Sequence, residues 1–176
     1  MAATWKAPNG LYEQLMAVVE KYHRPRLDSG VNLALALTDA KAFVKNRLNL
    51  GSTKKFTDFN KIWQKEPADF CITLVVDVWE GVLKDGQRDA LLDLHLTRIE
   101  PVYEPEVVIE NGKKKVIKDE FGRVKFTDTI KVDKDGNQKW QVLPIDLLVT
   151  ARNVRRYGLW FDDLIELQKA VVEATP

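Results

Sequence analysis

The stretch that decides the fold is Asp85–Glu100, which reads DGQRDALLDLHLTRIE. Its apolar residues recur at the three- and four-residue spacing of one helical face. Asp85 and Asp89 stand at the N-terminal end, where the helix dipole favours negative charge. We therefore expect a buried helix around which the other elements pack. The face contains Ala90, Leu91, Leu94 and Arg98.

The flanking sequence predicts an α+β fold with a small mixed sheet. A helical stripe runs from about Leu11 to His23, and Arg24-Pro25 is expected to end it. Residues 31–37 alternate in the manner of a strand, and Asp69–Val76 is nearly continuous in β-branched and aromatic residues, which favours a central strand. Two closing helices are predicted at Ile145–Tyr157 and Phe161–Ala174.

The segment between these strands is less regular. Residues 40–50 are compatible with a second strand or a short helix, Gly51-Ser52-Thr53 predicts a turn, and a short helix is expected from Thr57 or Asp58 to Trp63.

A change of character marks the residues from about 101 to 144. Short β-favouring runs alternate there with turn signals, among them Asn111-Gly112 and Asp135-Gly136, whose residues tolerate positive φ. We expect a single domain over residues 1–176 that carries a basic, β-rich insertion folded as a hairpin arm. No internal repeat and no glycine-rich phosphate motif is recognisable in the sequence.

Charge is distributed unevenly, although the formal net charge is only +1. The window 41–65 holds seven basic residues and one acidic residue, a balance of +6, with Phe43, Phe56, Phe59 and Trp63 interleaved. A second basic group with aromatic neighbours lies in the insertion, and Arg152, Arg155 and Arg156 form a third. Basic runs commonly serve only as solvated surface, and that interpretation stays open for each group.

Composition narrows the cellular context. No apolar run approaches the roughly 20 residues that span a bilayer, and the N-terminus has no signal-peptide core, so we expect a cytoplasmic protein without a membrane partner. The single Cys71 lies in an apolar run, which predicts a small core residue in a reducing compartment.

Ala90-Leu91-Leu92-Asp93, followed by residues 94–98, resembles the segment ALLDHELCH of the phage metallopeptidases, a small zincin-like family. Pro144-Ile145-Asp146 and the later Arg155–Trp160 are similar to the PHD…RHGLW of that family. The resemblance implies zincin-like helices and places Leu94, Arg98 and Ile145 at the three zinc-ligand positions and His95 at the general base. Leucine and isoleucine have no lone pair and arginine is no acceptor, so no metal, no cofactor and no catalysis are expected.

Degenerate members of the family resemble single-stranded-DNA-binding early proteins of lytic phages that carry their own RNA polymerase. This implies largely sequence-independent binding of single-stranded DNA in the infected bacterium, supporting phage replication or early transcription. Phage RNA polymerase or replication proteins are the implied partners, and a homo-oligomer is compatible with the sequence. Phosphate neutralisation and base stacking predict an affinity that falls steeply with salt. The expected contact residues are Lys54, Lys55, Phe56, Lys113, Lys114, Lys115, Arg123, Lys125 and Trp140.

Two alternatives remain. A protein-interaction module would dock on a phage or host enzyme through the arm and through exposed aromatics such as Trp140 and Trp160. A metallopeptidase with rearranged ligands would use Asp93, Glu100, Glu104 and His95. Asp93 and His95 are two residues apart, so they are expected to point to different faces of the helix. Neither His23 nor His95 has neighbours that suggest a catalytic triad, because those neighbours are mainly apolar or basic.

Overall fold

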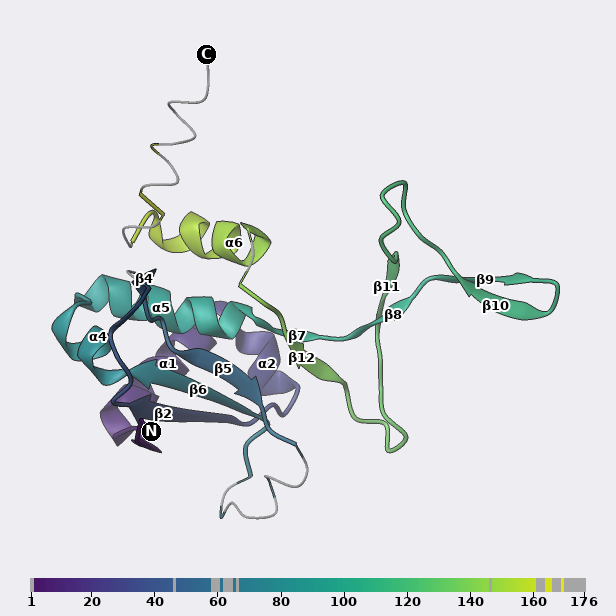
Figure 1. Ribbon diagram of the computed structural model, residues 1–176. Coiled ribbons are helices and arrows are strands. Elements are labelled where there is room, and N and C mark those ends of the chain that lie inside the picture. Colours follow the sequence, from purple (N-terminus) through teal and green to yellow (C-terminus); the bar gives the residue numbers. More distant parts are fainter. Residues whose placement is uncertain are drawn as a thin grey trace. The chain divides into compact units, whose positions relative to one another are not determined.

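A computed structural model describes residues 2–45, 47–57, 61, 65, 67–145, 147–160, 164, 165 and 169. Its helices and strands form the predicted α+β fold (Figure 1). The chain divides into two compact units, of which one comprises Met1–Arg98 with Val142–Pro176 and the other Ile99–Gln141. We call the second unit the arm and describe each unit by itself.

The first unit contains a four-stranded mixed sheet. Its strands are β1 (Thr4–Lys6), β2 (Leu33–Thr38), β6 (Phe70–Val75) and β5 (Ser52–Lys55), in the order β1-β2-β6-β5. β2 and β6 are parallel, whereas β1 and β5 pair antiparallel with their neighbours. The apolar run at residues 69–76 therefore forms an interior strand, as predicted.

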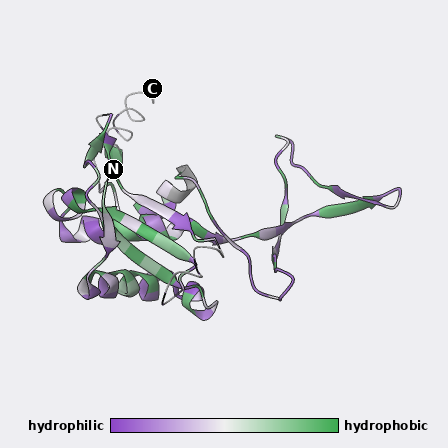
Figure 2. Cartoon of the chain, turned by 60° about the horizontal axis from the view of Figure 1, so that its bottom comes forward, coloured by the Kyte–Doolittle hydropathy of each residue, from purple (hydrophilic) through white to green (hydrophobic). Residues whose placement is uncertain are grey.

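Helices cover one face of this sheet (Figure 2). They are α1 (Asn9–Tyr22), α2 (Arg24–Asp28), α4 (Val76–Gly81), α5 (Asp85–Thr97) and α6 (Leu147–Tyr157). α1 and α6 both contact α5. All eight residues from Ala90 to Thr97 are buried, so α5 is the central helix that the sequence predicts. Arg24-Pro25 ends α1 as expected. The chain then enters α2, which accepts Pro25 in its first turn, because the backbone N–H groups of a first turn have no partner within the helix in any case.

The core follows from the periodicity of these elements. Alternate residues of β2 and β6 are buried, and the buried residues of α1 recur at helical spacing. In the predicted segment 40–50, the described residues form two short antiparallel strands, β3 (Phe43–Val44) and β4 (Arg47–Leu48), rather than one strand or a helix. Residues 58–60, 62–64 and most of 161–176, where two helices were predicted, lie outside the described residues.

Two local predictions near β5 and β6 are wrong. The predicted turn Gly51-Ser52-Thr53 contributes only Gly51, at φ +81°, before Ser52 begins β5. Cys71 is half-buried rather than a core residue, because it alternates with the inward-facing Phe70 and Ile72 and pairs with exposed Lys54 of β5.

The arm is a ladder of three short strand pairs. β7 (Ile99–Pro101) pairs with β12 (Trp140–Val142), β8 (Tyr103–Pro105) with β11 (Phe126–Ile130), and β9 (Val107–Glu110) with β10 (Lys113–Val116). Asn111 and Gly112 join β9 to β10 with φ of +51° and +75°, which confirms the predicted Asn-Gly hairpin.

Two lateral hairpins leave the ladder, at residues 117–126 and 131–140, and we call them finger 1 and finger 2. Each turns at a glycine with positive φ, Gly122 and Gly136, and each is closed by an isolated bridge. The two fingers share one hydrogen-bond pattern, which is a structural repeat although no repeat is recognisable in the sequence. The pattern escapes sequence comparison because only three of ten positions are identical, namely Asp119/Asp133, Gly122/Gly136 and Lys125/Lys139.

Candidate nucleic-acid interface

Lys54 and Lys55 lie on β5, at the edge of the sheet in the first unit, and both are exposed. Successive residues of a strand point to opposite faces, so these two lysines do not form one cationic patch. Phe56 follows directly and is half-buried, with its N–H donating to the Asp69 carbonyl at 2.8 Å. The predicted cluster at residues 54–56 is therefore spread over two faces of a sheet edge.

His95 fixes the chain that leads into this edge. Its Nε2 lies 2.6 Å from the Leu50 carbonyl, which can only accept, so Nε2 carries the proton and donates. Nδ1 then accepts from the Thr53 hydroxyl at 2.9 Å. Burial lowers the pKa of His95 from its ordinary value of 6.5 to about 4, so the ring is neutral near pH 7. The position that resembles a general base thus holds β5 in place.

The three lysines of β10 are exposed but do not share one face. In the register of the hairpin, Lys113 pairs with Glu110 and Lys114 with Ile109. Lys115 also forms an ion pair with Glu110, with Nζ 3.0 Å from Oε2. Lys113 and Lys115 therefore flank an acidic residue on one face, and Lys114 stands among apolar side chains on the other.

That second face is apolar and exposed. Val107, Ile109 and Val116 lie on it with exposed fractions of 46%, 71% and 40%. Sequence reasoning missed this surface, although a signal existed, since the run Val107-Val108-Ile109 has no neighbouring segment predicted to cover it. Within Ile99–Gln141 only Ile99 is buried, so the arm has almost no core of its own.

Arg123 and Lys125 belong to finger 1. Arg123 donates from Nε to Asp119 Oδ2 at 2.9 Å, and its guanidinium lies 5.0 Å from the centre of the Phe121 ring. Lys125 is exposed, and Phe126 beside it is 58% exposed. Phe121 is 72% exposed. Here the structure brings predicted cations and open aromatic rings together.

The predicted aromatic residues Trp140 and Trp160 differ in exposure. Trp140 is half-buried at the start of β12. Trp160 is only 5% exposed and donates from Nε1 to Asn153 Oδ1 at 2.5 Å, so its expected role as an exposed docking residue is wrong.

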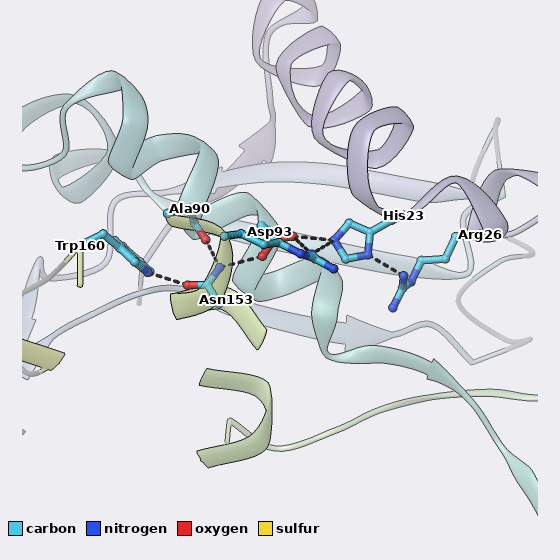
Figure 3. Close-up of polar contacts among 7 residues, drawn as sticks. His23, Arg26, Ala90, Asp93, Asn153 and Trp160 are labelled. Carbon is cyan, nitrogen blue, oxygen red and sulfur yellow. Dashed lines mark hydrogen bonds and ion pairs between the residues drawn. The ribbon is translucent and has the colours of Figure 1, made fainter. Parts of the chain in front are cut away.

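The third predicted basic group is also divided. Arg152, Arg155 and Arg156 are all exposed on α6, but Arg156 also donates from Nη1 to Asp93 Oδ1. Asp93 lies in a polar cluster with His23, Arg26 and Asn153 (Figure 3). Asp93 is fully buried, and its Oδ2 accepts from Asn153 at 2.8 Å. Arg156 therefore pairs with a buried charge.

His23 completes that cluster. Its Nε2 donates to Asp93 Oδ1 at 2.7 Å, because Nδ1, 2.6 Å from Arg26 Nη1, must be the acceptor. Burial lowers the pKa of His23. Burial alone would raise the pKa of Asp93, but hydrogen bonds from His23 and Asn153 outweigh it, and that pKa is lowered. The cluster joins α1, α5 and α6, and it gives His23 an acidic partner, Asp93, that its mainly apolar or basic neighbours in the sequence do not reveal.

The positions that resemble zinc ligands are occupied by structural residues. Leu94 is 2% exposed in the core, and Ile145 is 47% exposed. Arg98 donates from Nε to the Leu143 carbonyl at 2.8 Å, while its own carbonyl accepts from the Leu143 N–H at 2.8 Å. Asp93 and His95 point to different partners, as their spacing predicts. Among the described residues no group of three His, Cys, Asp or Glu side chains could hold a metal ion.

Charge in the arm is balanced rather than basic. Residues 99–141 contain nine lysines and arginines against nine aspartates and glutamates. Over the predicted insertion, residues 101–144, the balance is nine basic against eight acidic residues, so the insertion is only weakly basic as a whole and any attraction to phosphate depends on local groups of cations.

No protein-family model, no curated protein and no solved structure matches this chain.

Proposed function

We propose that the protein binds single-stranded DNA without sequence preference and that the arm provides the main contact surface. The observation that carries this proposal is finger 1, where the exposed rings of Phe121 and Phe126 stand beside Arg123 and Lys125. Unpaired bases stack on such rings, at about 1 to 3 kcal/mol per base, while neighbouring cations neutralise phosphates. Paired bases hide their faces, so single strands are preferred over duplex.

The resemblance to degenerate phage metallopeptidases supports the same function. The notable likeness is to the phage early protein Drc, which binds single-stranded DNA. On this basis the protein acts in the cytoplasm of an infected bacterium, in phage replication or early transcription, with phage RNA polymerase or replication proteins as partners. It holds the strand and performs no chemistry. In the described part of the chain, no helix is long and apolar enough to cross a membrane.

The charge balance of the arm changes the expected salt dependence. With nine basic and nine acidic residues in residues 99–141, only local cations contribute. If about three phosphates are neutralised, the slope of log K against log salt is about −2 for a single strand. That slope is shallower than the clustering of lysines in the sequence suggests.

Fluorescence anisotropy with matched single- and double-stranded oligonucleotides at two salt concentrations tests the proposal. We expect tighter binding to the single strand and weaker binding at higher salt. The triple variant Lys113→Glu, Lys114→Glu, Lys115→Glu should weaken binding and reduce the salt slope, whereas Lys21→Glu on the exposed surface of α1 should change neither. Equal affinity of the triple variant and the wild type would remove β10 from the interface.

A specific observation favours a second candidate, a protein-docking arm. The exposed face of Val107, Ile109 and Val116 fits a protein partner better than it fits a polyanion. An Ile109→Ala change would then abolish association with the partner while salt has little effect. Under the DNA-binding proposal the same change leaves DNA affinity nearly unaltered.

A further inference from the structure

Finger 1 and finger 2 are one structural unit repeated at an interval of fourteen residues. In finger 1 the Asp119 N–H donates to the Arg123 carbonyl at 2.8 Å and the Gly122 N–H to the Asp119 carbonyl at 3.0 Å. Finger 2 has the same two bonds. The Asp133 N–H donates to the Asn137 carbonyl at 2.9 Å, and the Gly136 N–H donates to the Asp133 carbonyl at 3.2 Å.

The aspartate of each finger also organises its turn in the same way. Asp119 Oδ1 accepts from the N–H groups of Phe121 and Arg123, both at 2.9 Å. Asp133 Oδ1 accepts from those of Asp135 and Asn137, at 2.8 and 2.9 Å. Bonds from these backbone N–H groups lower the pKa of both carboxyls. Each finger therefore has an aspartate that is occupied by its own turn.

Attachment to the ladder is repeated as well. The Lys125 N–H donates to the Ile117 carbonyl at 3.0 Å, and the Lys125 carbonyl accepts from the Glu106 N–H at 2.9 Å. The Lys139 N–H donates to the Lys131 carbonyl at 2.8 Å, and the Lys139 carbonyl accepts from the Val102 N–H at 2.8 Å. The two fingers thus attach four residues apart on the strand that leads outward, about 13 Å at 3.3 Å per residue.

The repeat preserves the groups that a nucleic acid would contact. Lys125 is followed by Phe126, and Lys139 by Trp140, at equivalent positions. Each finger contains three basic and two acidic residues, although the individual positions differ. Asp119 and Asp133 accept bonds from backbone donors but remain ionised, and Glu120 and Asp135 are exposed, so three basic against two acidic residues leave each finger with a net charge of +1. A lysine followed by an aromatic ring is thus present twice.

The fingers leave the arm on opposite sides. Figures 1 and 2 show the connection from β10 to β11 and the connection from β11 to β12 extending in opposite directions from the ladder. Phe126 and Trp140 themselves lie at the starts of β11 and β12, at the bases of the two fingers.

We propose that the arm contains two single-strand sites of the same backbone build, one at Lys125 and the exposed Phe126 and one at Lys139 and the half-buried Trp140, so that one chain holds two short single strands. This inference rests on the proposed function and adds its stoichiometry. The repeated attachment places each lysine and ring at the same position of its unit, at the base of its finger, and the two attachment points lie about 13 Å apart along the outgoing strand.

Native mass spectrometry of the full chain with an oligothymidylate of about four nucleotides, the lower end of known site sizes, counts the strands directly. We expect two per chain. Phe126→Ala or Trp140→Ala should leave one bound strand per chain. The affinity of the altered site should fall roughly 5- to 150-fold, because one base loses its stacking partner. The conservative variants Phe126→Trp and Trp140→Phe should restore two, which separates loss of stacking from a damaged fold.

Tyr12→Ala serves as the control, because Tyr12 is an exposed aromatic residue on α1 of the first unit and lies outside the proposed contact surface. It should leave two strands per chain. A wild-type chain that binds long oligothymidylate but never more than one short strand would overturn the two-site inference and leave DNA binding intact. Failure to bind single strands of any length would overturn both.

Discussion

At the scale of single residues, buried polar groups hold α5 in its place. His95 connects α5 to Leu50 and Thr53, and Asp93 connects it to His23 and Asn153. That His95 is a hydrogen-bonded structural residue could be predicted from its apolar helical setting. The pairing of Asp93 with His23 could not, since these residues are far apart in sequence and no spacing rule links them.

Stability should fall as pH decreases from about 6.5 to about 4, because of His95. The unfolded chain binds a proton on this ring near its ordinary pKa of 6.5, whereas the folded chain binds it only at about 4. Between these values acid favours the unfolded state, by up to about 3 kcal/mol at the lower end. The lowered pKa of His23 acts in the same direction. Urea unfolding at several pH values measures the slope.

The variant His95→Gln is the control for that slope. Glutamine can donate to the Leu50 carbonyl and accept from Thr53 without titrating, so its stability should depend less on pH. Identical slopes for the variant and the wild type would show that His95 does not carry the effect.

Two buried threonines should respond in opposite ways to replacement by valine. Thr97 Oγ1 is buried and has no hydrogen-bond partner among the described residues, so Thr97→Val should raise the free energy of unfolding by about 1 kcal/mol. Thr53→Val removes the hydroxyl that donates to His95 and should lower it by about 1 to 3 kcal/mol. Chemical denaturation of both variants checks the signs, and destabilisation by Thr97→Val would contradict the argument.

At the scale of elements, periodicity predicts what is regular and misses what depends on distant partners. The apolar run at residues 69–76 and the helical face around Leu91 are strong local patterns, and β6 and α5 form where these patterns place them. The two fingers have only three identical positions in ten. What they share is a set of backbone hydrogen bonds, which the residue types do not reveal. The ion pair of the exposed Arg156 with the buried Asp93 cannot be predicted from local patterns, because Asp93 lies on another element.

Gly51 is the element-level position where a side chain should be tolerated least. A Cβ there would lie 2.1 Å from the Thr73 carbonyl oxygen, in addition to the strain of φ +81°. Gly136, at φ +84°, has open space around it. We expect Gly136→Ala to cost about 1 kcal/mol from backbone strain alone and Gly51→Ala to cost distinctly more.

Thermal unfolding of these two glycine variants provides the measurement. Because Gly51 precedes β5, the larger loss should be accompanied by faster hydrogen exchange of the Lys54 amide, which faces Cys71 of β6 in the ladder. Equal losses of stability in the two variants would mean that the loop before β5 shifts away from Thr73 at no cost.

At the scale of the whole molecule, the two units differ in how much apolar surface they bury, which suggests that they have different roles. The first unit buries its apolar residues under α1, α5 and α6, whereas the described residues of the arm include only one buried side chain, Ile99. A segment that buries so little contributes little to stability, and its exposed rings and apolar residues remain available for a ligand. The first unit would then be a scaffold and the arm the interface.

Replacement of residues 100–141 by a two-residue Asn-Gly turn tests this division. Arg98 and Leu143 are joined by two hydrogen bonds of 2.8 Å, so the chain ends that remain are adjacent and a tight hairpin turn can connect them. The shortened chain should unfold cooperatively with a midpoint within a few degrees of the full chain, as calorimetry would record, because Ile99 is retained. It should also lose binding to single-stranded DNA. A shortened chain that fails to fold would make the arm part of the scaffold, and one that binds DNA as tightly as the full chain would move the interface to the first unit.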